Sequence, residues 1–471
     1  MTTATEPTAG WRDSARRIAP LAWPVLVGQV SVLAFGTIDT LFVARFAAHD
    51  LAALAVGAAA YITVFIGFMG VLMALSPIVG QLQGAGRHAE AGAQLHQALW
   101  VGLGLALLGS TLLAFPAPFL ALAQTAPEVE PRVRGYLLAL AFSLPASLLF
   151  TLFRAFNTAV SRPKVVMAIQ LGGLAAKVPL SAALVFGVPA LGVPALGVVG
   201  CGIATAIAMW AQVLLAWRVL RRDRFYDRYA IWGRGLDRPA RAPLVAQLKL
   251  GVPLGLSILV EVTGFAFMAL FIARLGTTAV AGHQLAVNLV SLMFMVPLAI
   301  GNAASTLVAQ AVGAGRHADA ARLGWHALAG GTGLALVLGL VVFVLREPVL
   351  GLYTADPAVR GAALALVAWL AVFHAADAAQ TIAAFVLRAY KITVVSVLIY
   401  VAALWGVGLT GGYWLAFDLS GSTPAALRGA PGYWFASTAG LVVAAVALSG
   451  VMGWVLRRSR QPAPPAPPPA G

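Results

Sequence analysis

The sequence predicts an all-α integral membrane protein, with twelve transmembrane helices in two lobes of six. Three observations lead to this class. Of the 471 residues 61% are hydrophobic and only 10% are charged, long apolar runs recur between charged or Pro/Gly-rich breaks, and the second half repeats the first. Soluble domains are about 25% charged. A bilayer-spanning helix needs about 20 apolar residues, and the runs are too long for the strands of a β-barrel.

Twelve apolar runs of this length follow one another along the chain. We expect helices at 18–44, 51–82, 93–122, 135–158, 165–188, 197–219, 245–273, 281–311, 323–345, 361–387, 394–416 and 432–456. The polar start, 1–17, leads into the first run with no small-residue cleavage signal, so we expect no removable signal peptide. The tail, 457–471, ends in PAPPAPPPAG, which is predicted to be disordered polyproline.

The two halves of the chain match at an offset of 229 residues. Pro24 falls on Pro253, and GAGRHAEA from Gly84 falls on GAGRHADA from Gly313. An offset of 234 aligns the Arg-Ala pairs that begin at 154 and 388. Each copy contains six helices, an even number, so both copies enter the membrane from the same side, as parallel repeats of transporters do. The predicted lobes are 18–220 and 245–456, joined by a basic linker at 221–244.

The distribution of charge predicts which side of the membrane the loops face. With both termini in the cytoplasm, 23 of the 31 Lys and Arg residues lie inside, seven lie outside, and Lys177 lies within a span. This bias follows the positive-inside rule and predicts a multi-pass membrane protein with both termini in the cytoplasm. The net charge of +15 therefore reflects topology. We expect the linker to face anionic lipid headgroups and not nucleic acid. One cysteine, Cys201, excludes an internal disulfide.

Three acidic residues lie within predicted spans: Asp39, Glu261 and Asp377. A carboxylate at the bilayer centre costs about 2.5–3.5 kcal/mol on insertion scales, so such residues usually line cavities, form pairs or bind ions. The three do not coincide under the repeat, because Asp39 falls on Met268 and Glu261 on Val32. These charges therefore arose separately on a duplicated scaffold, which favours a functional site.

Lys177 is the only base predicted inside a span. A lone lysine in hydrocarbon loses its proton or finds an acid. Asp39 is the only membrane acid in the same lobe, so we predict an Asp39–Lys177 pair. The alternative is that Lys177 snorkels toward an interface or a water-filled cleft.

Polar side chains accompany Asp377 along one helical face, with spacings of three and four. They are His374, Gln380 and Thr381. Carboxylates with neutral oxygens suit a hard cation such as sodium, and the same carboxylates can instead carry protons. We expect His374 to be a hydrogen-bonded polar neighbour and not an ion ligand.

Two further features belong to the candidate site. Gln284 and Asn288, one turn apart in the eighth span, add neutral oxygens. A phenylalanine lies four residues from each acid, namely Phe35, Phe265 and Phe373. Aromatic faces beside carboxylates bind cations, although lipid-facing or core packing is the ordinary role of any one phenylalanine. Prolines in the spans are read either as tolerated kinks or as hinges. No phosphate-binding loop, paired Cys/His metal spacing or catalytic triad order is visible.

Several segments together resemble the multidrug and toxic compound extrusion (MATE) family, in its NorM-like bacterial branch. They are Ile38-Asp39-Thr40, GQLQGAGRHAEA, FRAFNTAVSRPK, the segment 259–263, AGHQLAVNLVSLMFMVPLAIG and ADAAQTIAAFVLRAYKIT. The resemblance runs from about residue 18 to 456. It implies a two-lobed twelve-helix fold that exports organic cations in exchange for sodium or protons, without another cofactor.

The resemblance also implies roles for individual residues. Glu261 and Asp377 match ion-coupling acids, which would also be the Na⁺ ligands, and Asp39 matches an acid associated with protonation and substrate release. The sequence departs from the family pattern in two ways. In the fifth span, Lys177 and Ser181 stand at two places where relatives tend to have asparagine. Phe373 stands where a tyrosine is common. A built-in ammonium and a lost phenol oxygen both favour protons over sodium.

We therefore predict a monomeric antiporter of the bacterial inner membrane that works by alternating access and is not an enzyme. The alternative is a flippase for lipid-linked saccharides, which would present a basic cavity for pyrophosphate. Membrane acids outnumber membrane bases three to one, which disfavours this reading, although Lys177 keeps it open. A membrane enzyme is the third reading, and no nucleophile and base occur in a recognisable order.

Overall fold

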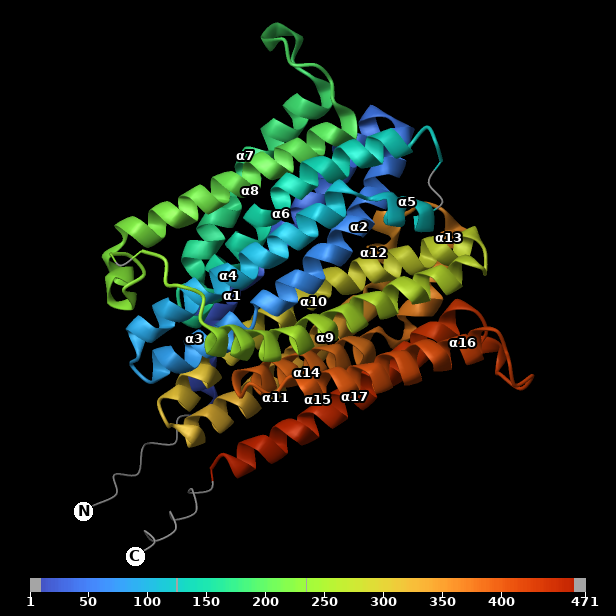
Figure 1. Cartoon of the computed structure of the whole chain (residues 1–471). Helices are drawn as coiled ribbons and strands as arrows, with labels where there is room; N and C mark the ends of the chain where they lie inside the picture. Colours follow the sequence, from blue (N-terminus) through green and yellow to red (C-terminus); the bar gives the residue numbers. More distant parts are fainter. Residues whose placement is uncertain (1–9, 124–125, 234, 461–471) are drawn as a thin grey trace, which may run out of the picture. The chain divides into compact units, whose positions relative to one another are not determined.

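The computed structural model describes residues 10–123, 126–233 and 235–460 (Figure 1). Within these residues, twelve helical stretches are long and apolar enough to cross a membrane: Trp11–Phe46, Ala48–Gly84, His88–Ala114, Glu130–Ala159, Pro163–Phe186, Gly197–Arg222, Arg241–Ala273, Thr277–Gly313, His317–Val344, Pro357–Ala389, Val394–Ala416 and Ala430–Arg458. This confirms the predicted class. The prolines of the predicted tail lie outside the described residues, as do residues 1–9.

The α-helices are labelled in Figure 1. The first repeat contains α1 (Trp11–Phe46), α2 (Ala48–Leu72), α3 (Leu75–Gly84), α4 (His88–Ala114), α5 (Ala117–Ala123), α6 (Glu130–Ala159), α7 (Pro163–Phe186) and α8 (Gly197–Arg222). The second contains α9 (Arg241–Ala273), α10 (Thr277–Gly313), α11 (His317–Val344), α12 (Arg346–Tyr353), α13 (Pro357–Leu366), α14 (Leu370–Ala389), α15 (Val394–Tyr400), α16 (Gly411–Ala416) and α17 (Ala430–Arg458). Among the described residues, the one recorded β-pairing is an isolated bridge between Val188 and Val193.

Prolines explain two breaks that the sequence analysis did not predict. The expected helix 51–82 is interrupted between α2 and α3, at residues 73–74. Pro77 lies four residues after Met73, and a proline ring clashes with the carbonyl group four residues earlier. The expected helix 93–122 is wrong at its end, because α4 stops at Ala114 and α5 is separate. Pro116 lies between them and restricts the residue before it.

The non-helical parts of the predicted N-terminal tail and of the linker are also shorter than expected. Helix α1 begins at Trp11, within the predicted N-terminal tail, α8 continues to Arg222, and α9 begins at Arg241. A short 3₁₀ helix, η2 (Arg224–Tyr229), lies between them. The first turns of α1 and α9 and the last turn of α8 contain polar residues, because they lie beyond the apolar part of each run.

The eleventh span differs from a regular α-helix over ten residues. Between α15 and α16 the chain forms the π-helix η4 (Val401–Thr410). It packs against α17 at Gly440, where an added Cβ atom would lie 2.6 Å from the carbonyl oxygen of Ala403. Widened helical turns of this kind occur frequently at functional sites. Tyr400, the last residue before η4, belongs to the site described below.

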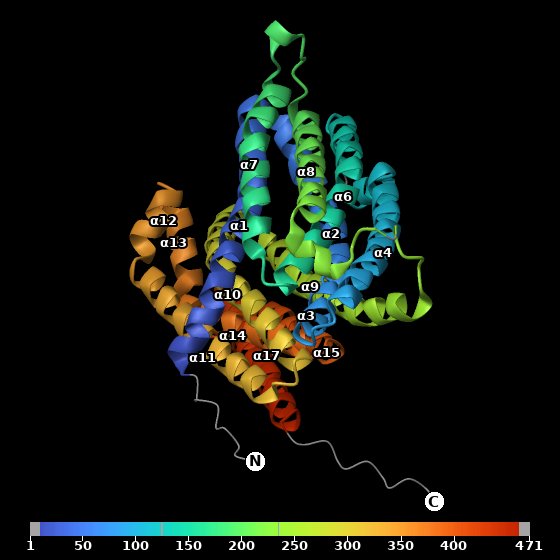
Figure 2. The same ribbon diagram turned by 90° about the vertical axis from the view of Figure 1, so that its left-hand side faces the viewer.

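The chain divides into two compact units, Ala19–Ala266 and a second unit made of Met1–Ile18 with Phe267–Gly471. In the first unit α6 packs against α2, α4 and α8 (Figures 1 and 2). Its side chains Leu144, Leu148, Leu152 and Phe156, spaced by one turn, are fully buried. In the second unit α14 packs against α10, α11 and α17. The units are defined by packing and the predicted lobes by the repeat, so the lobe boundaries stay a prediction.

Within the first unit, glycines allow α2 and α9 to approach closely. A Cβ atom at Gly70 would lie 2.5 Å from the Cα of Gly255, and one at Gly251 would lie 2.3 Å from the carbonyl oxygen of Val71. Side chains at these positions would push the two backbones apart. This contact fixes the position of α9 relative to α2 about two turns before Glu261.

Candidate functional site

Asp39 of α1 and Lys177 of α7 form an ion pair inside the first unit. The Lys177 Nζ lies 2.7 Å from the Asp39 Oδ2, and the two side chains are 1% and 9% exposed. The pairing predicted from the sequence is therefore present, and the snorkelling alternative is wrong. Each charge of the pair compensates part of the cost of burying the other.

The Lys177 ammonium also contacts Phe35, one turn before Asp39. It lies 4.4 Å from the centre of the phenyl ring and donates to the Phe35 carbonyl oxygen at 3.3 Å. A carboxylate and an aromatic face are what a buried organic cation requires. Lys177 thus occupies, as a tethered cation, the kind of site that was predicted for a substrate.

Two residues beside this pair were not predicted as site residues. The hydroxyl group of Ser181, already noted as a departure from the MATE pattern, and the thiol group of Cys201 are close neighbours of the Asp39 carboxylate. Cys201 lies on α8 and is fully buried. Helical periodicity places Ser181 one turn after Lys177, but nothing in the sequence indicated that α8 would contribute a residue.

A second cluster lies in the other unit and is defined here as Asp377, Gln380, Thr381 and Tyr400. The side chains of all four are buried. Gln380 Nε2 donates to Asp377 Oδ1 at 3.0 Å and lies 3.0 Å from Thr381 Oγ1. The Tyr400 hydroxyl group donates to Gln380 Oε1. The predicted grouping on one face of α14 is therefore present, and Tyr400 is an addition that no local pattern indicated.

Asp377 has neutral neighbours in this cluster. Among the described residues no Lys, Arg or His nitrogen within 4.0 Å pairs with its carboxylate. A buried carboxylate with only neutral donors is costly to keep ionised unless a proton or a small cation compensates its charge.

His374 differs from its predicted state. It is fully buried, and neither ring nitrogen has a hydrogen-bond partner among the described residues. The expectation of a hydrogen-bonded polar neighbour is therefore wrong for this structure. Phe373, beside it, packs its ring 5.4 Å from that of Trp434, whose indole N–H donates to His283 Nδ1 at 3.2 Å.

The remaining predicted site residues are less enclosed. Glu261 and Phe265 are half-buried on the part of α9 that belongs to the first unit. Gln284 and Asn288 are exposed on α10, and the Asn288 Oδ1 accepts from the Tyr353 hydroxyl group at 3.1 Å. Their roles as ion or substrate contacts stay predictions.

Arg154 is one of the basic residues expected at the cytoplasmic side of the membrane. The structure places it within α6, half-buried, with its guanidinium group 3.3 Å from both Gln29 Oε1 and Met69 Sδ. Its position five residues before the end of α6 is consistent with the expected side.

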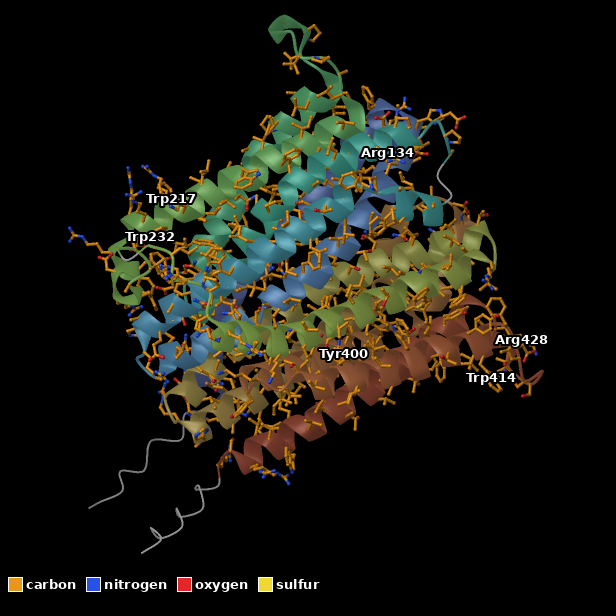
Figure 3. The ribbon with its side chains drawn as sticks, viewed as in Figure 1. Arg134, Trp217, Trp232, Tyr400, Trp414 and Arg428 are labelled. Carbon is orange, nitrogen blue, oxygen red and sulfur yellow. The ribbon has the colours of Figure 1, made fainter. Side chains whose placement is uncertain are left out.

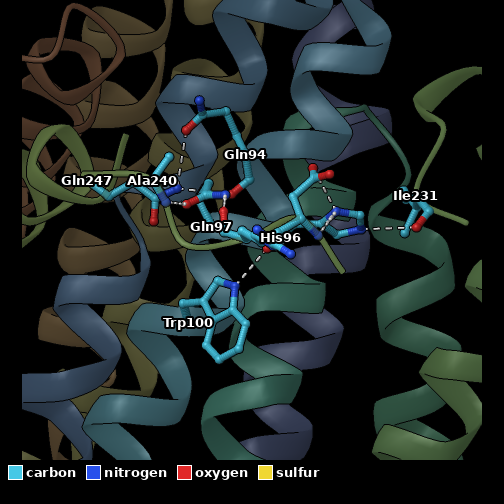
Figure 4. Close-up of polar contacts among 9 residues, drawn as sticks. Gln94, His96, Gln97, Trp100, Ile231, Ala240 and Gln247 are labelled. Carbon is cyan, nitrogen blue, oxygen red and sulfur yellow. Dashed lines mark hydrogen bonds and ion pairs between the residues drawn. The ribbon is translucent and has the colours of Figure 1, made fainter. Parts of the chain in front are cut away.

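Polar side chains of α4 hold the linker that follows α8 (Figure 4). His96 Nε2 lies 3.0 Å from the Ile231 carbonyl oxygen, and His96 Nδ1 lies 3.0 Å from an Asp237 carboxylate oxygen. The Trp100 indole N–H donates to the Asp237 carbonyl oxygen at 2.9 Å. Gln97 accepts from the Ala240 N–H at 2.8 Å. The linker is therefore docked on α4 by backbone and side-chain bonds.

The second repeat uses the matching part of α11 in the same way. There, Ser14 bonds to His326 Nδ1 at 2.7 Å, and Arg17 makes a bidentate pair with Asp319 at 2.9 and 3.1 Å. The 229-residue offset aligns His326 with Gln97. The third spanning helix of each repeat thus binds the chain at, or just before, the start of the first spanning helix of the other repeat.

Among the described residues, no three His, Cys, Asp or Glu side chains come together as a metal site. The site thus consists of single carboxylates, each with polar or aromatic neighbours. An arrangement of this kind can bind monovalent cations or protons, and it can bind organic cations.

Twelve spans, a repeated six-helix unit and buried single acids define a polytopic membrane protein built like a secondary transporter. The MatE family model matches residues 24–183 and 253–414, and the chain belongs to this family. The two matches begin at Pro24 and Pro253, the pair that the 229-residue offset aligns, which supports the duplication.

Relatives of similar length support the family assignment. A protein named "Probable multidrug resistance protein NorM", from Aromatoleum aromaticum, is 43% identical and covers 94% of each chain. The "Multidrug resistance protein PmpM" of Pseudomonas aeruginosa is 34% identical, over 93% of this chain and 91% of PmpM. The crystal structure of the Vibrio cholerae MATE transporter VcmN, in its bent form, is 20% identical with a TM-score of 0.84, covering 95% of this chain and 98% of VcmN. The last comparison shows the fold alone.

Proposed function

We propose that this protein is a multidrug efflux antiporter that exports organic cations in exchange for H⁺ or Na⁺ by alternating access. The relatives named above support multidrug efflux, and family membership supports a transporter over an enzyme. The observation that carries the coupling is the buried Asp377, whose carboxylate has a neutral amide donor and no cation among the described residues. Such a group binds a small cation or a proton in one part of the cycle. In another part, an organic cation competes with that ion for the same negative charge.

In this proposal the Asp377 cluster holds the coupling ion. Gln380 orients the carboxylate through its amide N–H, and Tyr400 fixes Gln380 in turn. Thr381 adds a neutral oxygen. Glu261 is proposed as a second coupling acid on the basis of its match to the family pattern. An ion that binds the outward-open state more tightly than the inward-open state shifts the cycle toward drug release.

The Asp39–Lys177 pair supports a matching role in the first lobe. Lys177 neutralises Asp39 and lies over the Phe35 ring. An organic cation that enters here would replace the ammonium group on the same carboxylate and the same ring. We propose that this exchange, with protonation of Asp39, accompanies substrate binding and release.

The pairing of Lys177 also bears on the flippase alternative. Lys177 was the base that favoured a pyrophosphate-binding cavity, and in the structure its charge is neutralised by Asp39. This weighs against a cavity built for anions. The proposal includes cytoplasmic termini, an inner-membrane location, a monomer and no nucleic-acid partner, all inferred from charge distribution and family pattern.

Ethidium efflux from proteoliposomes, under an imposed pH gradient or sodium gradient alone, tests the proposal. We expect efflux under one of the two gradients and its loss in Asp377→Asn and Glu261→Gln, with unchanged protein content. Asp227→Asn is a matched control, because Asp227 is an exposed acid in η2. Undiminished efflux in the two site variants would remove these residues from the mechanism, and turnover of a lipid-linked saccharide without ethidium efflux would favour the flippase.

A further inference from the structure

The outer face of α8 carries a continuous apolar stripe that ends at a basic residue. Ile207, Trp210, Leu214 and Trp217 are all exposed, between 41% and 63%, and Arg221 follows. Their spacings of three and four residues place them on one side of the helix. The stripe therefore runs along a spanning helix and reaches a cation at its end.

A second indole ring meets this stripe where it becomes basic. Trp232, from the linker, packs edge-on against Trp217 with ring centres 6.4 Å apart, and its indole N–H donates to the Leu220 carbonyl oxygen at 2.9 Å. The Arg221 guanidinium group lies 5.2 Å from the centre of the Trp217 ring. Figure 3 shows both indoles at the outside of the same end of α8. Trp232 is held there because linker residues on both sides of it, Ile231 and Asp237, are docked on α4 (Figure 4).

The charge around this position is strongly positive and only partly compensated. Eight arginines and three aspartates occur from Arg218 to Arg241. Of these acids, Asp223 pairs with Arg162 and Asp237 contacts His96. Among the described residues no acid forms an ion pair with Arg221.

We propose that this surface, made of Ile207, Trp210, Leu214, Trp217, Arg221 and Trp232, binds one anionic glycerophospholipid. An acyl chain would lie along the apolar stripe, the two indoles would contact the interfacial region, and the phosphate would meet Arg221. Indole rings prefer the headgroup level and arginine prefers anionic headgroups, so the order of residues matches the order of groups in a lipid. The inference concerns a bound lipid and does not depend on the proposed transport activity.

The second repeat offers a matched control. Arg458 lies 5.2 Å from the centre of the exposed Trp454 ring at the end of α17, with the same four-residue spacing. The described aromatic contacts include no second indole against Trp454. General attraction between basic residues and a membrane would treat the two arginines alike, whereas a built lipid site requires the indole pair of α8.

Native mass spectrometry of the purified full chain, titrated with phosphatidylglycerol or phosphatidylcholine of equal acyl chains, tests this. We expect the first phosphatidylglycerol to bind more tightly than phosphatidylcholine. Arg221→Gln should weaken phosphatidylglycerol binding about five-fold, the effect of one basic residue near an anionic surface, and Arg458→Gln less than about two-fold. Equal effects of the two substitutions, or no preference for the anionic lipid, would overturn the proposal.

Two further arms identify the ligand and the indole contribution. Trp232→Ala should weaken the binding of both lipids, because it removes an interfacial contact and no charge; unchanged binding would contradict the proposal. Glycerol 3-phosphate at matching concentration should not compete, since it lacks acyl chains. Effective competition would mean that the surface recognises a free phosphate and not a lipid. All substituted side chains are exposed. The melting temperature of each variant in detergent should therefore equal that of the unaltered protein.

Discussion

The ammonium nitrogen of Lys177 lies 2.7 Å from a carboxylate oxygen of Asp39, and both side chains are almost completely shielded from solvent. Removing one member of a buried ion pair leaves the other charge buried and uncompensated, which destabilises the protein. The pair therefore links the stability of the first lobe to the charge state of a residue proposed to act in transport.

The first prediction concerns this pair. Lys177→Met should lower the free energy of unfolding by about 3–5 kcal/mol, because Asp39 is left buried and unpaired. The double variant Asp39→Asn/Lys177→Met should be more stable than Lys177→Met alone, since neither charge remains. Thermal unfolding in detergent measures both. A double variant no better than the worse single variant would show that the two residues do not depend on each other.

Tyr400 tests the internal order of the Asp377 cluster. Tyr400→Phe removes the donor to Gln380 Oε1, so the amide that orients Asp377 loses its fixed position. We expect gradient-driven efflux to fall about ten-fold, which corresponds to about 1.4 kcal/mol, within the range for one buried hydrogen bond. Tyr433→Phe is the control, because the Tyr433 hydroxyl group has no hydrogen-bond partner among the described residues. A similar loss in both variants would mean that the Tyr400 bond has no special role.

The contact between α2 and α9 predicts a steric effect. Gly70→Ala places a methyl group 2.5 Å from the Gly255 Cα, a distance that real Cβ atoms do not show, so the helices must separate. We expect a loss of about 1–3 kcal/mol in the free energy of unfolding, as for other overpacked sites. Gly172→Ala, where nothing lies within 4 Å, should leave the melting temperature unchanged or slightly higher. Equal melting temperatures for the two variants would contradict the close approach.

Docking of the linker predicts resistance to proteolysis. His96→Ala removes bonds to Ile231 and Asp237, so trypsin should cleave after the linker arginines about ten-fold faster, because local opening is easier by the value of one to two hydrogen bonds. His49→Ala, at an exposed histidine, should not change the rate. Cleavage of the unaltered protein at the rate of the His96 variant would mean that the linker is not held in solution.

Asp223 gives a prediction for pH. A hydrogen bond from the Phe225 N–H, and next the Arg162 guanidinium group, hold the pKa of this carboxyl below its ordinary value of 3.8. The folded protein therefore binds this proton less readily than the unfolded chain, so the contribution is present at neutral pH and is lost as pH falls through the lowered pKa. Asp223→Ala should lower the melting temperature at pH 7, and the difference should shrink in acid. A difference that grows in acid would contradict this assignment.

The number of spans, the duplication and the Asp39–Lys177 pair were accessible from the sequence because each follows from a local or strong signal. The lengths of the apolar runs determine the spans. Because one lobe contains a single membrane base and a single membrane acid, only one pairing neutralises both charges. The breaks at Met73 and Phe115 follow from nearby prolines and were missed, because apolar composition continues through them.

Contacts between helices could not be predicted in the same way. Tyr400 reaches Gln380 across 20 positions, and Cys201 reaches Asp39 from another helix. Such contacts depend on how helices pack and rotate, which periodicity alone does not determine. The unpaired ring nitrogens of His374 were missed for the same reason, since its neighbours on α14 are polar and suggested partners.

The most direct test of the central claim measures whether a drug and the coupling ion compete for Asp377. Binding of tetraphenylphosphonium to the purified protein is measured as pH or sodium concentration is changed, in the unaltered protein and in Asp377→Asn. We predict that affinity for the organic cation falls as the concentration of protons or sodium ions increases, and that this dependence is lost in Asp377→Asn. An affinity that responds to neither ion in the unaltered protein, or responds equally in the variant, would contradict it.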